Sequence, residues 1–326
     1  MDKCSLMNEA EFTTRKPEFP GVMRAYEKVS AILPPTPVMS FEINGRQVWA
    51  KADSLQPIGA FKLRGAWHRL TDLSEAERAR GVVAFSSGNH AQGVAWAASR
   101  LGIAATIVIP RDAPPIKVEA TRSWGAEIIL YDRAKEDRAE IAARIASKSG
   151  ATVVPSFDDP WIIEGQGSAG LEAIKQLGFE PDLIVTPCGG GGLAAGLALS
   201  APHAQIAISE PEGWDDMKRS LEGGVIVPVG PNPPSTACDA LQTLLVSPLT
   251  FDVLRSRGAK GVAVSDGEIG MAMRFARNTL GLTLEPGGAA GLAALLYEKV
   301  EPVGRTLVML SGGNVEPAVF AAMTKG

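Results

Sequence analysis

The chain has 326 residues, more than a single hydrophobic core usually organises, so we expect two domains or two lobes. Its 45% hydrophobic and 21% charged residues are typical of a globular protein and exclude a chain that is disordered throughout. The formal net charge of -4 comes without a basic block, which argues against nucleic acid as a partner, and no apolar stretch approaches the roughly 20 residues of a membrane span.

The first residues and the cysteines indicate a cytoplasmic protein. The chain opens with charged and polar residues, whereas a secretory signal has an apolar core behind a basic start. Cys4, Cys188 and Cys238 are far apart and odd in number, so they predict neither a disulfide framework nor a clustered metal site.

From about residue 81, short β-branched runs alternate with helical stretches. The predicted strands are 82–85, 105–109, 127–131 and 152–154, and the predicted helices are 91–101, 116–124 and 136–149. Strands separated by helices of this length are typical of parallel βαβ units. A second series, with strands at 183–186, 205–209 and 305–310, begins at Asp182. The sequence therefore predicts an α/β fold with two parallel-sheet lobes.

The predicted boundaries lie near residue 80 and in the segment 155–160, where two prolines interrupt regular structure. We expect a small substrate-binding domain at 80–157, inserted into a large cofactor-binding domain made of 1–79 and 158–326. Ligands of open α/β sheets bind beyond the carboxyl ends of the strands. The crevice between the lobes is therefore where we expect the chemistry.

The strongest single motif is a run of four glycines between a predicted strand and a predicted helix: Gly189, Gly190, Gly191 and Gly192, followed by Leu193. Such a loop gathers backbone N–H groups and a helix N-terminus around one anion, which suits a phosphate. No Lys-Ser or Lys-Thr follows, so this is not a Walker loop. The alternative is a loop whose glycines only allow close helix packing.

Three further segments carry polar groups. Lys62 precedes a predicted helix, and a lysine beside a phosphate site can join an aldehyde cofactor if its pKa is lowered; most lysines at such positions are simply solvated. The segment Ser86-Ser87-Gly88-Asn89-His90 opens the next helix and suits a carboxylate, with plain helix capping as the alternative. Ser311-Gly312-Gly313-Asn314 places a hydroxyl at the end of a predicted buried strand.

In this order and spacing, the four motifs resemble the serine/threonine dehydratase and serine racemase family. These are pyridoxal-phosphate enzymes with the tryptophan-synthase β-subunit fold, also called fold type II. The resemblance spans about residues 30 to 320. It implies a homodimeric enzyme that binds pyridoxal 5′-phosphate between the two lobes and acts on a small amino acid.

The resemblance also implies roles for individual residues. Lys62 would be the Schiff-base lysine, and Ser87 the second acid/base on the opposite face of the cofactor. The residues expected at the cofactor are Phe61, Lys62, Asn89, Gly189, Gly190, Gly191, Gly192, Leu193, Glu285 and Ser311. The residues expected at the substrate are Ser86, Ser87, Asn89, His90 and Arg138. Asn89 would bond the ring oxygen of the cofactor, and Ser311 would meet its pyridine nitrogen. A serine there does not force protonation of that nitrogen, which favours prompt loss of a β leaving group.

A divalent cation is a further expectation. Glu210, the Trp214 carbonyl and Asp216 match the family's positions for Mg²⁺ or Ca²⁺, which both prefer oxygen ligands. An acidic surface turn is the alternative for this segment.

The expected activity is α,β-elimination of a β-hydroxy-amino acid to a keto acid and ammonia, with L-serine or L-threonine as the default substrate. A serine racemase or a 3-hydroxyaspartate dehydratase is the alternative; a second substrate carboxylate would need a basic partner, for which Arg133, Lys135 and Arg138 are candidates.

Ala60 stands where many members carry serine, so a hydrogen bond near Lys62 is not expected. Because no regulatory module is expected after Gly326, neither is feedback by isoleucine. A binding protein that has lost catalysis is a further alternative, against which the intact Lys62, Ser87 and Ser311 argue.

Overall fold

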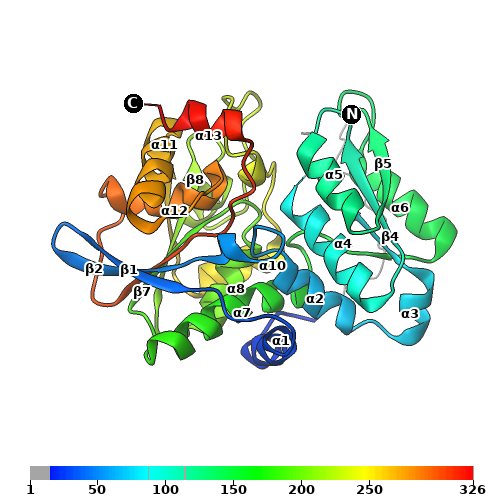
Figure 1. The fold of residues 1–326 in the computed structure, drawn as a ribbon, viewed down its shortest axis with the longest axis horizontal. Coiled ribbons are helices and arrows are strands. Elements are labelled where there is room, and N and C mark those ends of the chain that lie inside the picture. The colour runs from blue at the N-terminus through cyan, green and yellow to red at the C-terminus, as the bar shows by residue number, and fades with distance from the viewer. Residues whose placement is uncertain (1–14, 87, 114, 326) are drawn as a thin grey trace.

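Two β-sheets form the two lobes of the molecule, which lie side by side (Figure 1). The computed structural model describes residues 15–86, 88–113 and 115–325. In the large lobe, six strands follow the order β1-β2-β10-β7-β8-β9; in the small lobe, four follow the order β5-β4-β3-β6. The expected α/β fold with two parallel-sheet lobes is confirmed, and we propose that the small lobe folds as the domain of residues 80–157.

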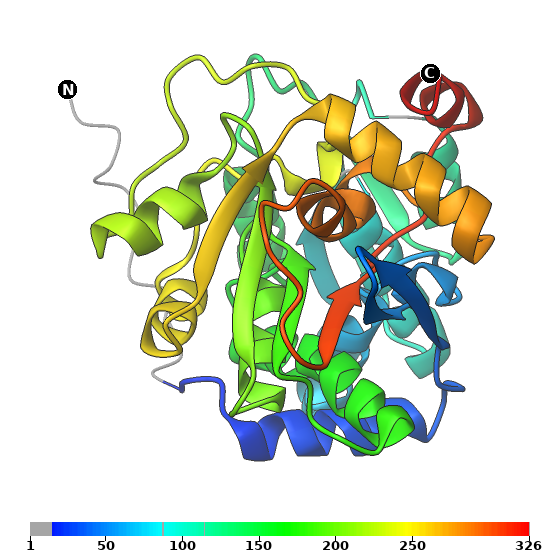
Figure 2. The ribbon, with the colours of Figure 1, turned by 90° about the vertical axis from the view of Figure 1, so that its left-hand side faces the viewer.

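The strands of the large sheet are β1 (Val38–Ile43), β2 (Arg46–Lys51), β7 (Leu183–Pro187), β8 (Gln205–Pro211), β9 (Lys260–Val264) and β10 (Thr306–Met309). Those of the small sheet are β3 (Val82–Phe85), β4 (Ala105–Pro110), β5 (Glu127–Tyr131) and β6 (Thr152–Val153). All pair in parallel except β1 with β2, which form an antiparallel hairpin at one edge of the large sheet (Figure 2). The sequence analysis missed this hairpin and β9.

The helices of the large lobe are α1 (Phe19–Ser30), α2 (Leu63–Thr71), α7 (Pro160–Leu177), α8 (Gly192–Ser200), α9 (Asp216–Gly223), α10 (Pro248–Ser256), α11 (Asp266–Phe275), α12 (Pro286–Leu296) and α13 (Pro317–Met323). The others are α3 (Glu75–Arg80), α4 (Asn89–Leu101), α5 (Pro115–Ser123) and α6 (Arg138–Ser149). Three short elements complete the order: the 3-10 turns η1 (Asp53–Leu55) and η2 (Asp239–Leu241), and the π-helical turn η3 (Ala276–Leu280). In the described residues, no helix is long and apolar enough to cross a membrane.

Alternation along the strands explains why helices cover both faces of each sheet. In β7, Leu183 and Val185 face a core shared with α11 and α12, whereas Ile184 faces a second core shared with α7 and α8. In β3, Val82 packs with α2 and α4, and Val83 packs with α6. Successive side chains of a strand point to opposite faces, so near-continuous apolar runs are the signature of sheets buried on both sides.

A buried ionic network ties the first turn of α2 to the rest of the large lobe. Arg64 donates to Asp53 from Nε at 2.8 Å and to Glu172 from Nη1 at 3.0 Å and Nη2 at 2.8 Å. Lys51 donates to Glu172 at 2.5 Å. Two cations face two carboxylates in the interior, so no charge there is left uncompensated. Lys62 directly precedes α2, and Arg64 lies in the first turn of this helix. The network therefore also fixes the position of the backbone at Lys62.

We expect the Arg64→Met variant to lower the free energy of unfolding by about 3 to 5 kcal/mol, because removing one partner leaves buried carboxylates without their cation. Urea unfolding measures this change. The matched control is Arg305→Met, which removes the exposed ion pair with Asp182 and should shift the midpoint little. Equal midpoints for the two variants would show that the network does not stabilise the fold.

Candidate active site

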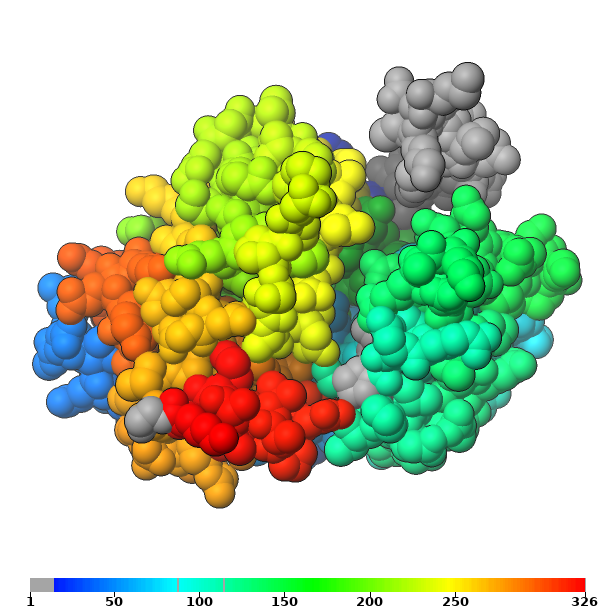
Figure 3. Space-filling model, turned by 90° about the horizontal axis from the view of Figure 1, so that it is seen from above, coloured from blue at the N-terminus to red at the C-terminus, as the bar shows by residue number. Residues whose placement is uncertain are grey.

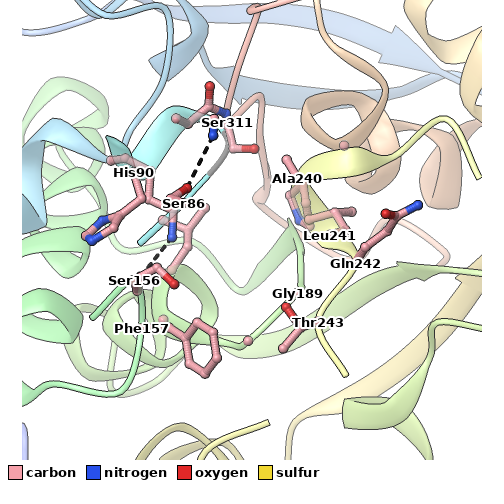
Figure 4. A pocket seen from close by; sticks show the side chains of 18 of the residues that line it. Ser86, His90, Ser156, Phe157, Gly189, Ala240, Leu241, Gln242, Thr243 and Ser311 are labelled. Carbon is pink, nitrogen blue, oxygen red and sulfur yellow. Dashed lines mark hydrogen bonds between the residues drawn. The ribbon is translucent and has the colours of Figure 1, made fainter. Parts of the chain in front are cut away.

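A pocket opens between the two lobes at the carboxyl ends of their strands. Ser86 follows β3, Gly189 follows β7 and Ser311 follows β10, and all three line the pocket. Figure 4 shows Ser86, His90, Ser156 and Phe157 on one side of it and Gly189 and residues 240–243 on the other. From above, the yellow chain near residues 230–245 faces the green and cyan small lobe (Figure 3). This is the position that the sheet topology predicts for a ligand.

The structure brings together in this pocket all the described residues expected at cofactor or substrate: Phe61, Lys62, Ser86, Asn89, His90, Arg138, Gly189, Gly190, Gly191, Gly192, Leu193, Glu285 and Ser311. Ser87, expected as the second acid/base, lies outside the described residues. Residues far apart in sequence therefore converge on one cavity.

Lys62 has the properties of a reactive amine. Its Nζ donates to the carbonyl oxygen of Ser156 at 2.8 Å, and no described carboxylate forms an ion pair with it. Burial lowers the pKa of Lys62 to about 8, because the interior disfavours the charged ammonium. A substantial fraction of the amine is therefore neutral near pH 8, and only the neutral form attacks an aldehyde.

Backbone bonds hold the loop that carries Lys62 against the loop after β10. The N–H of Phe61 donates to the Ser311 carbonyl at 3.0 Å, and the N–H of Gly313 donates to the Gly59 carbonyl at 2.8 Å. Ala60 and Gly312 form an isolated antiparallel bridge between these bonds. The expected lysine and the expected pyridine-binding serine are thus positioned by one short ladder.

The tetraglycine loop leads into α8 and leaves the start of this helix without a side-chain cap. Gly191, with φ of 85°, is the residue before α8, and it offers the helix no side-chain cap. A Cβ at Gly190 would lie 2.3 Å from the Phe157 ring, and one at Gly191 would lie 2.7 Å from Met217. The loop therefore needs glycine sterically, and its helix end is left for an anion. These residues fit the phosphate of pyridoxal 5′-phosphate.

His90, at the start of α4, is buried and neutral. Burial, followed by the nearby Lys62 charge, lowers the pKa of His90 to about 3. Its Nε2 lies 2.9 Å from the Val154 carbonyl, which can only accept, so Nε2 carries the hydrogen. Nδ1 of a neutral imidazole is then an acceptor. Any role of His90 toward a substrate carboxylate therefore falls to its backbone N–H.

Asn89 and Glu285 are joined in a directed chain of hydrogen bonds. Asn314 donates from Nδ2 to the Ile58 carbonyl and to Oδ1 of Asn89, both at 2.7 Å. Asn89 in turn donates from Nδ2 to Oε1 of Glu285 at 2.5 Å. Burial raises the pKa of Glu285 to about 7. The amide NH₂ of Asn89 thus points toward Glu285. Its second hydrogen remains available for the ring oxygen of the cofactor.

Of the three basic residues considered for a second substrate carboxylate, only Arg138 lines the pocket. Arg133 is paired with Asp112 at 2.8 Å and Lys135 with Asp132 at 3.6 Å, and both are exposed. The Arg138 guanidinium lies 5.6 Å from the centre of the Phe85 ring, and no described carboxylate forms an ion pair with it. Arg138 is therefore an exposed cation at the edge of the pocket, with no ion pair to a described carboxylate.

The expected metal residues lie together beside the tetraglycine loop but outside the pocket. Glu210 accepts from the backbone N–H groups of Met217 at 3.1 Å and Lys218 at 2.7 Å, and burial raises its pKa well above the usual range. Both carboxylate oxygens of Asp216 are buried without a hydrogen-bond partner, and burial raises its pKa to about 6. Two buried carboxylates, of which Asp216 has both oxygens orphaned, fit a hard divalent cation. The described residues contain no cluster of three or more His, Cys, Asp or Glu side chains suited to a metal.

Three pocket contacts escaped the sequence analysis. Asn314 stood in a quoted motif, but nothing in the sequence showed its bond to Asn89. Lys117 on α5 forms an ion pair with Asp239 in η2, across the lobes. Ser156, whose carbonyl holds Lys62, looked only like part of a boundary segment. No local signal marks such pairs, because each depends on how the two lobes meet.

Comparison with known proteins gives the family. The model of a family described as pyridoxal-phosphate dependent enzyme matches residues 29–312. The chain belongs to the pyridoxal-phosphate dependent enzymes. The expected resemblance and the expected cofactor are thereby confirmed.

Relatives of this pyridoxal-phosphate enzyme cover nearly its whole length. It is 40% identical to L-threo-3-hydroxyaspartate ammonia-lyase of Pseudomonas sp., over 94% of the chain and 98% of the relative. It is 38% identical to the protein of the same name from Saccharomyces cerevisiae, over 95% and 97%. Among solved structures, maize serine racemase superposes with a TM-score of 0.89 at 34% identity, over 94% and 97% of the two chains.

We expect Glu210 and Asp216, as ligands of a divalent cation, to make the stability of the fold depend on Ca²⁺ or Mg²⁺. Without the ion, the raised pKa of Asp216 means that the folded protein binds a proton more tightly than the unfolded chain. Stability is then lost as pH rises from about 4 toward 6. Thermal unfolding of wild type and Asp216→Asn across this range should show a larger loss in wild type, because Glu210, whose pKa is also raised, contributes to the loss in both proteins. Added Ca²⁺ should raise Tm of wild type alone; a Tm that the ion leaves unchanged would contradict the site.

Proposed function

We propose that this enzyme is an ammonia-lyase that converts 3-hydroxyaspartate to the corresponding four-carbon keto diacid and ammonia. The single observation that carries the proposal is Arg138, a pocket-lining cation with no carboxylate partner among the described residues. A substrate with a second carboxylate supplies that partner, whereas the neutral side chains of serine and threonine leave the guanidinium unpaired. The names of the two relatives support the same substrate. L-serine and L-threonine, the expected defaults, are thereby less favoured.

The proposed roles rest on the residues that line the pocket. The tetraglycine loop and the start of α8 would hold the cofactor phosphate, Asn89 would bind the ring oxygen and Ser311 would bind the pyridine nitrogen. When bound, pyridoxal phosphate accepts the electron pair that Cα retains on losing its proton. Lys62 takes that proton, since its lowered pKa allows a neutral amine near pH 8.

We propose that the substrate enters with its α-carboxylate at the start of α4, near Ser86, Ser87 and the N–H groups of Asn89 and His90. Its distal carboxylate then faces Arg138. Loss of the β-hydroxyl as water and of the amino group as ammonia balances the reaction: the water consumed in hydrolysis replaces the water released in elimination.

Serine racemisation is the second candidate, supported by the superposition on maize serine racemase. A racemase needs an acid/base on each face of the substrate, which is the role expected of Ser87. A chiral assay with L-serine separates the two candidates, because elimination yields a keto acid and racemisation yields D-serine.

Lys62→Ala should abolish covalent capture of the cofactor. In wild type, we expect borohydride to fix pyridoxal phosphate to a peptide containing Lys62, and the rate of cofactor attachment to apoenzyme to rise with pH up to about 8, as the amine becomes neutral. Peptide mapping and visible absorbance measure these outcomes. Lys135→Ala, at an exposed lysine, is the matched control. A label on another lysine refutes the assignment.

Arg138→Met should raise KM for 3-hydroxyaspartate by about 10- to 100-fold, since a charge-assisted bond contributes roughly 1.5 to 3 kcal/mol. Turnover of L-serine, which lacks the second carboxylate, should change little. Steady-state keto-acid formation from both substrates measures the split, with Arg133→Met as the control. Equal losses on both substrates would count against a dicarboxylic substrate.

A further inference from the structure

Lys117 and Asp239 form an ion pair that crosses from the small lobe to the large lobe at the pocket. Lys117 lies on α5 and Asp239 in η2, and both side chains line the cavity. Nζ of Lys117 donates to the Asp239 carboxylate. Neither residue was expected from the sequence, and the roles proposed above leave both without a function.

The ammonium group lies beside the anion-binding end of α4. A Cβ built on Gly88 would lie 3.8 Å from Nζ of Lys117, so the amine is in near contact with this loop. Gly88 is the residue before α4 and provides no side-chain cap. A helix N-terminus and a lysine thus converge on one spot, and both favour a negative charge there.

The two partners of the pair are unequally exposed to water. The Lys117 side chain is 8% exposed, whereas that of Asp239 is 43% exposed. A nearly buried ammonium without a counter-ion is costly, so Lys117 requires a carboxylate at all times. Asp239 can turn into solvent at little cost, because a half-exposed carboxylate is already partly hydrated. Asp239 can therefore be replaced by another carboxylate, whereas Lys117 stays in place.

The same charges reach the other acid of the pocket. Burial is the main cause of the raised pKa of Glu285, the Lys117 charge opposes it and the Asp239 charge adds to it. The bond from Asn89 opposes it as well. Lys117, Asp239 and Glu285 are thus close enough to interact electrostatically, and a substrate carboxylate in the pocket would interact with all three.

We propose that Lys117 binds the α-carboxylate of the substrate and that Asp239 is the counter-ion it holds until the substrate displaces it. This rests on the proposed function only in requiring an amino acid as the ligand. The exchange keeps one carboxylate on Lys117 before and after binding, so no buried charge is left unpaired. Lys117 then serves every amino acid, whereas Arg138 serves only those with a second carboxylate.

The test is a binding titration of the holoenzyme with L-alanine and L-aspartate, which lack a β-hydroxyl and are not eliminated. The change in visible absorbance gives Kd for each. Lys117→Met should raise both Kd values at least about 10-fold, because a charge-assisted bond is lost. Asp239→Asn should lower both by about 3- to 10-fold, because the internal competitor no longer occupies the cation. Arg138→Met should raise Kd for L-aspartate alone.

The matched controls are Arg133→Met and Asp112→Asn, which break an ion pair on the surface of the same lobe and should leave both Kd values within about twofold. If Asp239→Asn weakens binding or leaves it unchanged, the ion pair serves only to hold the two lobes together, and the proposal is wrong. That outcome can be read even if Lys117→Met does not fold. Failure of wild type to turn over 3-hydroxyaspartate would refute the proposed function while leaving the displacement of Asp239 to be decided by these titrations.

Discussion

The site depends on keeping one lysine amine partly desolvated and without a carboxylate counter-ion at the junction of two sheets. The only described hydrogen-bond acceptor of Lys62 is the neutral Ser156 carbonyl, and burial lowers the pKa of its amine. An ion pair favours the protonated amine, and Glu172 has this effect on Lys51, whose pKa burial nevertheless lowers. Two lysines eleven positions apart thus differ in their surroundings, because Lys51 has a buried anion beside it and Lys62 has none among the described residues.

That constraint explains the rigid framing of the lysine. The loop before Lys62 is bonded to the loop after β10, and the helix after it is held by Arg64 in an ionic network with full charge compensation. A reactive group with a single described hydrogen bond of its own has to be positioned by its neighbours. Much of the buried polarity in the large lobe therefore serves placement of the backbone around Lys62 as well as stability.

The predictable part of the molecule is the part encoded locally. Apolar runs bounded by glycine and proline predicted the strands around residues 82–85, 183–186 and 305–310 and hence the two sheets, because buried parallel strands need such runs. The same approach missed the β1–β2 hairpin, although Asn44 and Gly45, both with positive φ, form a turn whose sequence is a strong hairpin signal. It also missed β9, which has a glycine as its second residue.

In the site, the glycine loop and Lys62 were predictable because each requires a particular residue type at one position. The partners of Asn89 and the pairing of Lys117 with Asp239 were not, since a hydrogen bond between distant segments leaves no pattern in either. His90 shows a further limit: the sequence places it at the start of a helix, but only the Val154 carbonyl reveals which ring nitrogen carries hydrogen. The burial and the tautomer of His90 depend on residues that are distant in sequence and meet it only in the folded protein.

The order of strands in the small sheet has a consequence for how its lobe can move. β3 and β6, the first and last strands of that sheet, are neighbours, so the chain enters and leaves the small lobe along the same edge. Rotation about two adjacent crossings displaces each point in proportion to its distance from them. Ser86 directly follows β3, beside the crossings, whereas α5 packs on β5, the strand at the opposite edge of the sheet. A rotation of the small lobe would therefore displace α5 further than the loop that begins at Ser86.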